Sequence, residues 1–119
     1  MSQALLIVDH GSRLSEANEM LHNVAEILRQ KRPDLIVHVA HMELADPDIA
    51  RGIEACVNDG ATRIIVHPYM LSPGRHATQD IPKMAAEAAR GYPNITVTVT
   101  APLGLHDKLA DVVLERAGL

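Results

Sequence analysis

The chain has 119 residues, a formal net charge of −4, no tryptophan and no phenylalanine. An acidic balance without aromatic stacking platforms argues against nucleic-acid binding. No apolar run approaches the length of a membrane span, and the N-terminus lacks the basic region and cleavage site of a signal peptide. We therefore expect one soluble cytoplasmic domain over residues 1–119, and the single cysteine excludes an internal disulfide or a cysteine-ligated cluster within one chain.

The first third of the chain predicts a strand, a helix and a second strand. Residues 4–9 form a continuous apolar run, which is typical of a strand buried on both faces. Ser15 is expected to cap a helix over residues 16–31, whose apolar side chains keep helical spacing. Residues 35–40 then predict the second strand.

The middle of the chain predicts a helix followed by a third strand. Asp46 and Pro47 pair a capping residue with a proline suited to the first helical position. The helix should run to about residue 58, with Gly60 as its C-terminal stop. Residues 63–70 predict the strand.

The last third predicts a helix, a strand and a final helix. Asp80 is expected to open a helix that ends at Gly91, and the alternating residues 95–100 indicate an edge strand. The final helix should cover about residues 107–117 and close at Gly118. Strands that alternate with helices predict an α/β fold, with a four-stranded parallel sheet and helices on both faces.

Polar side chains follow all four predicted strands. Ligands of open α/β sheets bind beyond the carboxyl ends of the strands, which share one edge. A histidine after a single strand is more often an ordinary loop residue than a ligand, but here every strand end carries one. These histidines are His10, His41, His76 and His106. Of the other three, His22 is expected to face solvent from a helix, whereas His38 and His67 should pack within strands.

Two or three imidazoles that meet one carboxylate would suit a divalent transition metal, from iron to zinc. Glu43 is the carboxylate at the second strand end, whereas calcium or magnesium would require several. Arg13 and Arg75 lie close in sequence to His10 and His76, and would add positive charge for an anionic substrate. The sequence thus predicts a metal site beside a cationic surface.

Phosphate chemistry is a weaker alternative. The phosphatases that use a phosphorylated histidine have an arginine immediately before the His-Gly pair, and here that place is taken by Asp9. The glycine patterns of nucleotide-binding loops are absent. Ser12 and Ser72 lack the strained turn that presents a nucleophilic serine.

Four stretches resemble the short form of the class II tetrapyrrole chelatases, the sirohydrochlorin cobaltochelatase and ferrochelatase family. They are LLIVDHGSR (5–13), MELADPDI (42–49), PYMLSPGRHATQDIP (68–82) and PLGLHDKLADVVLER (102–116). These stretches keep the family's order and spacing over nearly the whole chain. The SPGRH segment followed by Asp-Ile-Pro is specific, whereas HGSR alone would not be.

The resemblance implies insertion of a divalent metal into sirohydrochlorin without ATP, on the way to cobalamin, sirohaem or a nickel tetrapyrrole. The metal, Co²⁺, Fe²⁺ or Ni²⁺, is a substrate, and no organic cofactor or iron–sulfur cluster is expected. The absence of a histidine-rich loop makes nickel the weakest of the three. The short forms of the family pair as homodimers, which we also expect here. A carrier that binds metal or tetrapyrrole without turnover would use the same ligands.

The same resemblance implies that His10, His76 and Glu43 bind the metal. Insertion must also remove two pyrrole protons, and the sequence leaves open which of the three side chains accepts them. Other contacts are predicted from position alone. Arg13 and Arg75 would pair with substrate carboxylates, and apolar contact with the ring would come from Met42, Met70 and Leu71.

Three further residues are expected to support the ligands from behind. Asp9 could orient His10 through its other ring nitrogen, or could be a buried carboxylate bonded to backbone amides. His41 lies two residues before Glu43, so both should point the same way in an extended chain. His106 either approaches the site or lies near the N-terminus of the final helix.

Overall fold

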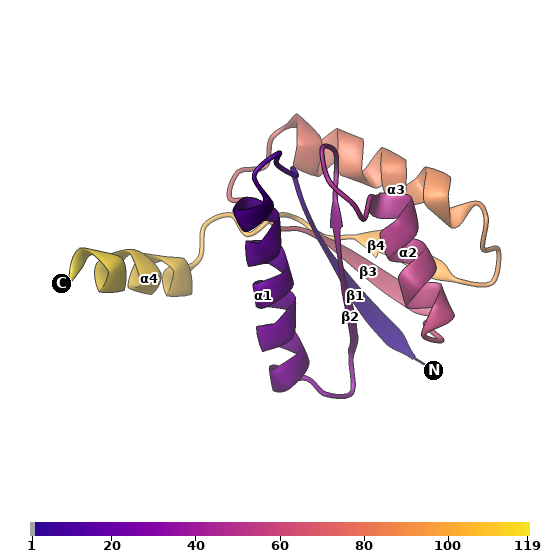
Figure 1. Ribbon diagram of the computed structural model, residues 1–119, viewed down its shortest axis with the longest axis horizontal. Coiled ribbons are helices and arrows are strands. Elements are labelled where there is room, and N and C mark those ends of the chain that lie inside the picture. The colour runs from indigo at the N-terminus through magenta and orange to yellow at the C-terminus, as the bar shows by residue number, and fades with distance from the viewer. Residues whose placement is uncertain (1) are drawn as a thin grey trace.

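A four-stranded parallel sheet forms the centre of the protein in a computed structural model that describes residues 2–119 (Figure 1). Its strands lie in the order β2-β1-β3-β4, so β4 is an edge strand, as its alternating sequence predicts. All three strand pairings are parallel, which confirms the predicted α/β architecture. The strands are β1 (Gln3–Asp9), β2 (Ile36–His41), β3 (Arg63–Pro68) and β4 (Thr96–Val99).

Helices cover both faces of the sheet, also as predicted. Helix α1 (Ser15–Lys31) packs against β1 and β2 on one face. Helices α2 (Ile49–Asn58) and α3 (Ile81–Ala89) pack on the opposite face and contact each other. A short π-helical turn, η1 (His76–Asp80), leads into α3. The loops that follow the strands therefore open at one edge of the sheet.

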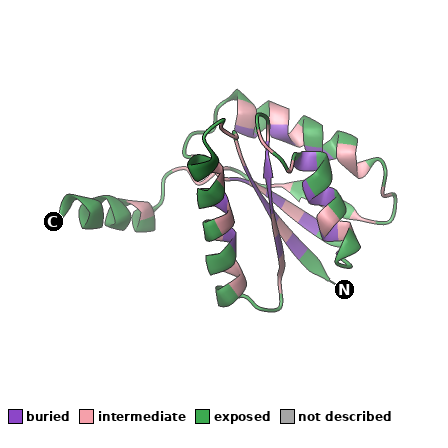
Figure 2. Cartoon of the chain, in the orientation of Figure 1, coloured by how far each residue is buried: buried purple, intermediate pink, exposed green. Residues whose placement is uncertain are grey.

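The two helical layers enclose two apolar cores (Figure 2). The larger core lies under α2 and α3 and includes the fully buried Leu6, Ile53 and Ile64. The smaller core lies under α1 and includes Ile7 and Leu21. Successive residues of β1 thus serve opposite faces, which explains its uninterrupted apolar sequence.

Cys56 lies in the larger core and has no exposed surface. Burial, with a smaller contribution from the Asp59 carboxylate, raises the pKa of its thiol to about 12. The thiolate is the form that binds metal. Cys56 is therefore a core residue and not a ligand.

Two of the predicted helix-capping residues are wrong. Ser15 does not cap α1: the flanking residue is Leu14, which makes no side-chain cap. The Ser12 hydroxyl instead accepts a hydrogen bond from the Leu14 amide at 3.0 Å. Helix α2 is capped by Asp48, whose carboxylate accepts from the Arg51 amide at 2.9 Å, and not by Asp46.

Helix α4 (Asp107–Ala117) extends away from the rest of the molecule (Figure 1). It ends where predicted, with Gly118 in a left-handed conformation at φ 74°. None of its residues is buried, although Val112, Val113 and Leu114 are apolar. Within residues 2–119, nothing packs over this apolar surface of α4.

None of the helices within residues 2–119 has the length and apolar character that crossing a membrane would require. The cytoplasmic location stays a prediction from the sequence.

Candidate metal site

His10 and His76 lie together at the carboxyl edge of the sheet. His10 directly follows β1, and His76 begins η1 after β3. Their imidazole rings meet edge to face, with centroids 4.5 Å apart and planes at 89°. Two imidazoles this close can contact the same ion, and their nitrogens suit transition metals.

Asp80 holds the His76 ring in place. The Nδ1–H group of His76 donates to Oδ2 of Asp80 at 2.9 Å. The neutral ring then carries its free lone pair on Nε2, so that nitrogen is available to a metal. Carboxylate–imidazole pairs of this kind orient metal-binding histidines in many proteins.

Helix α3 begins at Ile81, directly after Asp80 as the sequence predicts, but the Asp80 side chain pairs with His76 and does not cap the helix. Asp80 has helical backbone angles and makes no side-chain cap. The helical turn already begins at His76, and the Ile81 amide donates to the His76 carbonyl in a π-type bond. Isolated π-turns occur often at functional sites. A histidine four residues before a carboxylate is the sequence signal that could have indicated the pair.

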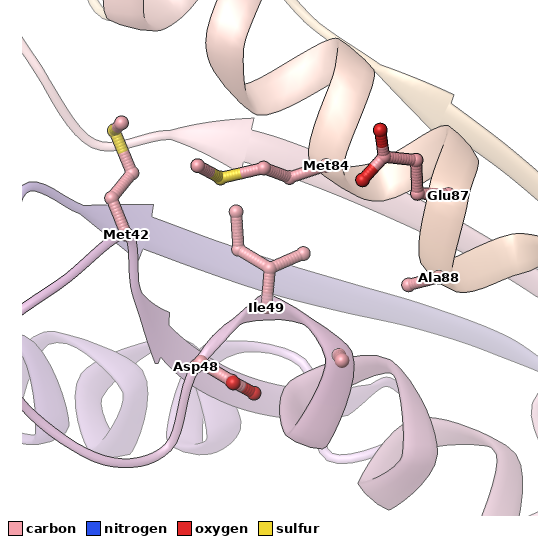
Figure 3. A pocket seen from close by; sticks show the side chains of 7 residues that line it. Met42, Asp48, Ile49, Met84, Glu87 and Ala88 are labelled. Carbon is pink, nitrogen blue, oxygen red and sulfur yellow. The ribbon is translucent and has the colours of Figure 1, made fainter.

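A pocket of about 330 Å³ opens beside the two histidines. Met70 and Leu71 line it, as expected from their positions after β3. Met42 does not: it lines a separate pocket of about 430 Å³ between α2 and α3. Figure 3 shows the Met84 side chain extending above Ile49 toward the side of the pocket on which Met42 lies. The three predicted apolar contacts are thus divided between two surfaces.

Glu43 is tied to His10 through the backbone. Its amide donates to the His10 carbonyl at 3.1 Å, and its side chain is exposed. Gly11 makes this approach possible, because it has φ 86° and a Cβ there would lie 1.8 Å from the Glu43 carbonyl oxygen. Among residues 2–119, however, no three His, Cys, Asp or Glu side chains are gathered in a way that could hold a metal. The side chains of His10, His76 and Glu43 do not form a closed cage within this chain.

Asp9 does not orient the His10 ring, which was the first of the two roles expected for it. Its Oδ1 atom accepts from the His41 Nδ1–H group at 2.6 Å and from the Gly11 amide at 3.0 Å. The backbone amide bond fits the second reading of the sequence, but the partner imidazole is His41 and not His10. The two residues are register partners on β1 and β2. Asp9 therefore joins the two strand ends that carry His10 and Glu43.

His41 is fully buried, so it does not reach the site directly. Within the described chain its Nε2 atom is buried and has no hydrogen-bond partner. The ring of His22 lies nearby, with centroids 6.1 Å apart. His22 is half-buried against this neighbour, so the prediction that it faces solvent is wrong.

The fourth strand-end histidine serves the final helix. His106 is exposed, and its Nδ1 atom accepts a hydrogen bond from the Lys108 amide at 3.1 Å. His106 therefore caps the N-terminus of α4, which is one of the two positions expected for it from the sequence. Arg13 and Arg75 are both exposed near the edge, where they can meet an anionic ligand.

The two histidines within strands lie on opposite faces of the sheet. His38 pairs with Asp59 at the end of α2, with Nε2 and Oδ2 at 2.7 Å. His67 is bonded to the Thr100 hydroxyl at 2.9 Å, and burial lowers the pKa of its imidazole. Both are half-buried and belong to the packing of the sheet, as their positions predict.

Comparison with known proteins gives one family. The model of the CbiX family matches residues 4–118. The sirohydrochlorin ferrochelatase of Arabidopsis thaliana chloroplasts is 45% identical over 115 residues, which are 97% of this chain. The sirohydrochlorin cobaltochelatase of Methanococcoides burtonii is 36% identical over 121 residues, and the match covers 95% of this chain.

A solved structure gives the same result. The sirohydrochlorin chelatase SirB from Bacillus subtilis subspecies spizizenii, in complex with cobalt, superposes with a TM-score of 0.92 at 36% identity over 99% of this chain. Two of these relatives are about twice as long as the matched region: the chain covers 51% of the Arabidopsis protein and 50% of the SirB chain. It spans 92% of the Methanococcoides protein.

Proposed function

The chain belongs to the CbiX family, and from this premise we propose that it inserts a divalent metal, Co²⁺ or Fe²⁺ in preference to Ni²⁺, into sirohydrochlorin without ATP. The observation that carries the proposal is the edge-to-face pair of His10 and His76, with ring centroids 4.5 Å apart beside a pocket. Related chains named for both metals support the choice of cobalt or iron. No organic cofactor and no iron–sulfur cluster enter this proposal.

The two histidines are proposed to hold the incoming metal through nitrogen. His76 is the better oriented of the two, because Asp80 engages its Nδ1 atom and leaves Nε2 free. The exposed carboxylate of Glu43, whose backbone amide is bonded to the His10 carbonyl, is proposed to accept the two pyrrole protons one after the other and to release each to solvent. The nitrogens of sirohydrochlorin supply the remaining ligands as the ion leaves the protein.

Substrate binding is proposed to use charge and apolar contact together. Arg13 and Arg75 are exposed beside the two histidines and can pair with carboxylates of the substrate. Met70 and Leu71 line the pocket and can contact the ring. Met42 lines the other pocket and so does not belong to this surface.

The test mixes the pure protein with anaerobic sirohydrochlorin and Co²⁺, Fe²⁺ or Ni²⁺, and follows the absorption change against a reaction without protein. Several turnovers per chain would support the chelatase. One stoichiometric event per chain would indicate a carrier of metal or tetrapyrrole instead. No change with any of the three metals would contradict the proposal.

Replacing Asp80 by Ala should lower the affinity for Co²⁺ by about 10- to 100-fold, because His76 loses the carboxylate that orients it. Titration of the protein with Co²⁺, followed by visible absorption, measures the change. The matched control is Asp59→Ala, which removes the carboxylate that pairs with His38 away from the site. Equal affinity in both variants would show that Asp80 does not act on the metal.

We further propose that the protein is a homodimer in which α4 packs against the second copy. On the face of the sheet that α1 covers, Ile65 and His67 of β3 are only half-buried. Helix α3 packs against the neighbouring β4 from the opposite face, and no helix within residues 2–119 packs against β4 from the α1 face. Helix α4 carries unburied apolar residues and extends away from its own sheet (Figure 1). Exchange of this helix between two copies would cover both surfaces.

Light scattering should therefore give a mass twice the 12.9 kDa of one chain at micromolar concentration. Val113→Glu places a charge on α4, where Val113 is 65% exposed, and should produce the monomer mass. Met84→Glu changes an exposed apolar residue on the opposite layer and should keep the dimer. A monomer mass for the unmodified protein would be incompatible with the homodimer.

A further inference from the structure

An exposed leucine follows every strand of the sheet. Leu14, Leu44, Leu71 and Leu105 have exposed fractions of 71, 55, 65 and 103%. The strand order β2-β1-β3-β4 arranges their loops in one row along the carboxyl edge. We call these four residues the leucine rim. A single exposed leucine is ordinary on a protein surface, but one at each of four strand ends of a sheet is a pattern.

Leu44 is unusual for a second reason. Its backbone lies in the left-handed region at φ 68°, and it is the one residue other than glycine with positive φ among residues 2–119. A leucine there is strained, whereas glycine or asparagine adopts this conformation readily. Strained residues persist where the surrounding structure or the function requires them. This leucine is strained and also exposed, and it directly follows Glu43.

Three residues of the leucine rim are connected to the histidine pair or to its pocket. Leu71 lines the pocket that contains His10 and His76. Leu44 follows Glu43, whose amide is bonded to the His10 carbonyl. Leu105 is held near Leu71, because the Gly104 amide donates to the Leu71 carbonyl at 2.9 Å. A flat ligand that presents its centre to the histidines would therefore lie over Leu44, Leu71 and Leu105.

We propose that the leucine rim is the surface on which the apolar face of the tetrapyrrole ring packs, and that Leu44 is a binding residue for it. This inference rests on the proposed function. Arg13 precedes Leu14 and Arg75 follows Leu71 by four residues, so positive charges flank the apolar row. A ring with an apolar face and carboxylates on its edge matches that arrangement.

The experiment measures binding of metal-free sirohydrochlorin by its absorption change, without added metal. In Leu44→Asn the left-handed backbone is retained while the apolar side chain is lost. Its dissociation constant should rise about tenfold, as for other lost apolar contacts, and Leu71→Ser should behave similarly. Leu44→Met keeps an apolar side chain and should retain the affinity. Ile27→Ser is the matched control, because Ile27 on α1 is also 55% exposed.

A second readout separates binding from stability. Leu44→Asn should melt at the same temperature as the original protein or higher, since the strain of leucine is relieved. Weaker binding in a protein that is no less stable identifies a binding residue.

Unchanged sirohydrochlorin affinity in both Leu44→Asn and Leu71→Ser would overturn the inference. So would a loss of affinity in Ile27→Ser of the same size. If these variants change the molecular mass and leave affinity unchanged, the leucine rim contacts a second copy of the chain and not the ring. Failure of the unmodified protein to bind sirohydrochlorin at all would instead refute the proposed function.

Discussion

His76→Ala and His10→Ala should each lower the rate of metal insertion by about 10³-fold. Each change removes one of the two imidazoles whose rings meet edge to face at the carboxyl edge. Both side chains lie at the surface, with His10 exposed and His76 half-buried. Neither substitution leaves a cavity in the core, so the melting temperature should change little. The rate is measured by the absorption change of sirohydrochlorin with Co²⁺ under anaerobic conditions.

The control for these two variants is His38→Ala. His38 is also a partly exposed histidine with a carboxylate partner, but its ring lies beside Asp59 at the end of α2. Removal should leave insertion at its original rate. If His10→Ala and His76→Ala both retained full activity, the assignment of the site to this pair would be incorrect.

The fold could be predicted from the sequence because its strongest signals are periodic and local. The apolar run at residues 4–9 requires burial on both faces, and helices on both faces of the sheet satisfy it. The alternation at residues 95–100 similarly requires an edge. Helix starts were less predictable. Asp46 and Asp48 are both capable caps, and only the path of the loop decides that Asp48 reaches an amide.

The candidate site was predictable in position but not in its connections. Strand ends identify the edge where His10, His76 and His106 lie, because parallel strands end on one side. The orientation of each ring depends on contacts that the sequence does not state. Asp9 bonds His41, which lies 32 positions away, because the register of β1 and β2 makes them partners. His106 caps α4 because its ring accepts a hydrogen bond from the Lys108 amide, two residues further along the chain.

Gly11→Ala should have the largest effect on stability of any glycine replacement beside the site. The φ of 86° is strained for alanine, and the added Cβ would lie 1.8 Å from the Glu43 carbonyl oxygen. That oxygen belongs to backbone held by the bond from the Glu43 amide to His10. Strain and overpacking together should cost roughly 3 kcal/mol of the free energy of unfolding. Urea denaturation measures this loss.

Gly60→Ala separates the two contributions to that loss. Gly60 has a similar φ of 94°, but a Cβ there would meet no atom within 4 Å. Gly60→Ala should therefore lose only the free energy of unfolding that comes from placing alanine at positive φ, about 1 kcal/mol. The difference between the two losses of unfolding free energy is the cost of the clash between the new Cβ after β1 and the Glu43 carbonyl after β2. Equal losses would mean that the carbonyl of Glu43 moves aside without cost. In that case Gly11 could not be what fixes Glu43 beside His10, and insertion in Gly11→Ala should remain near its original rate.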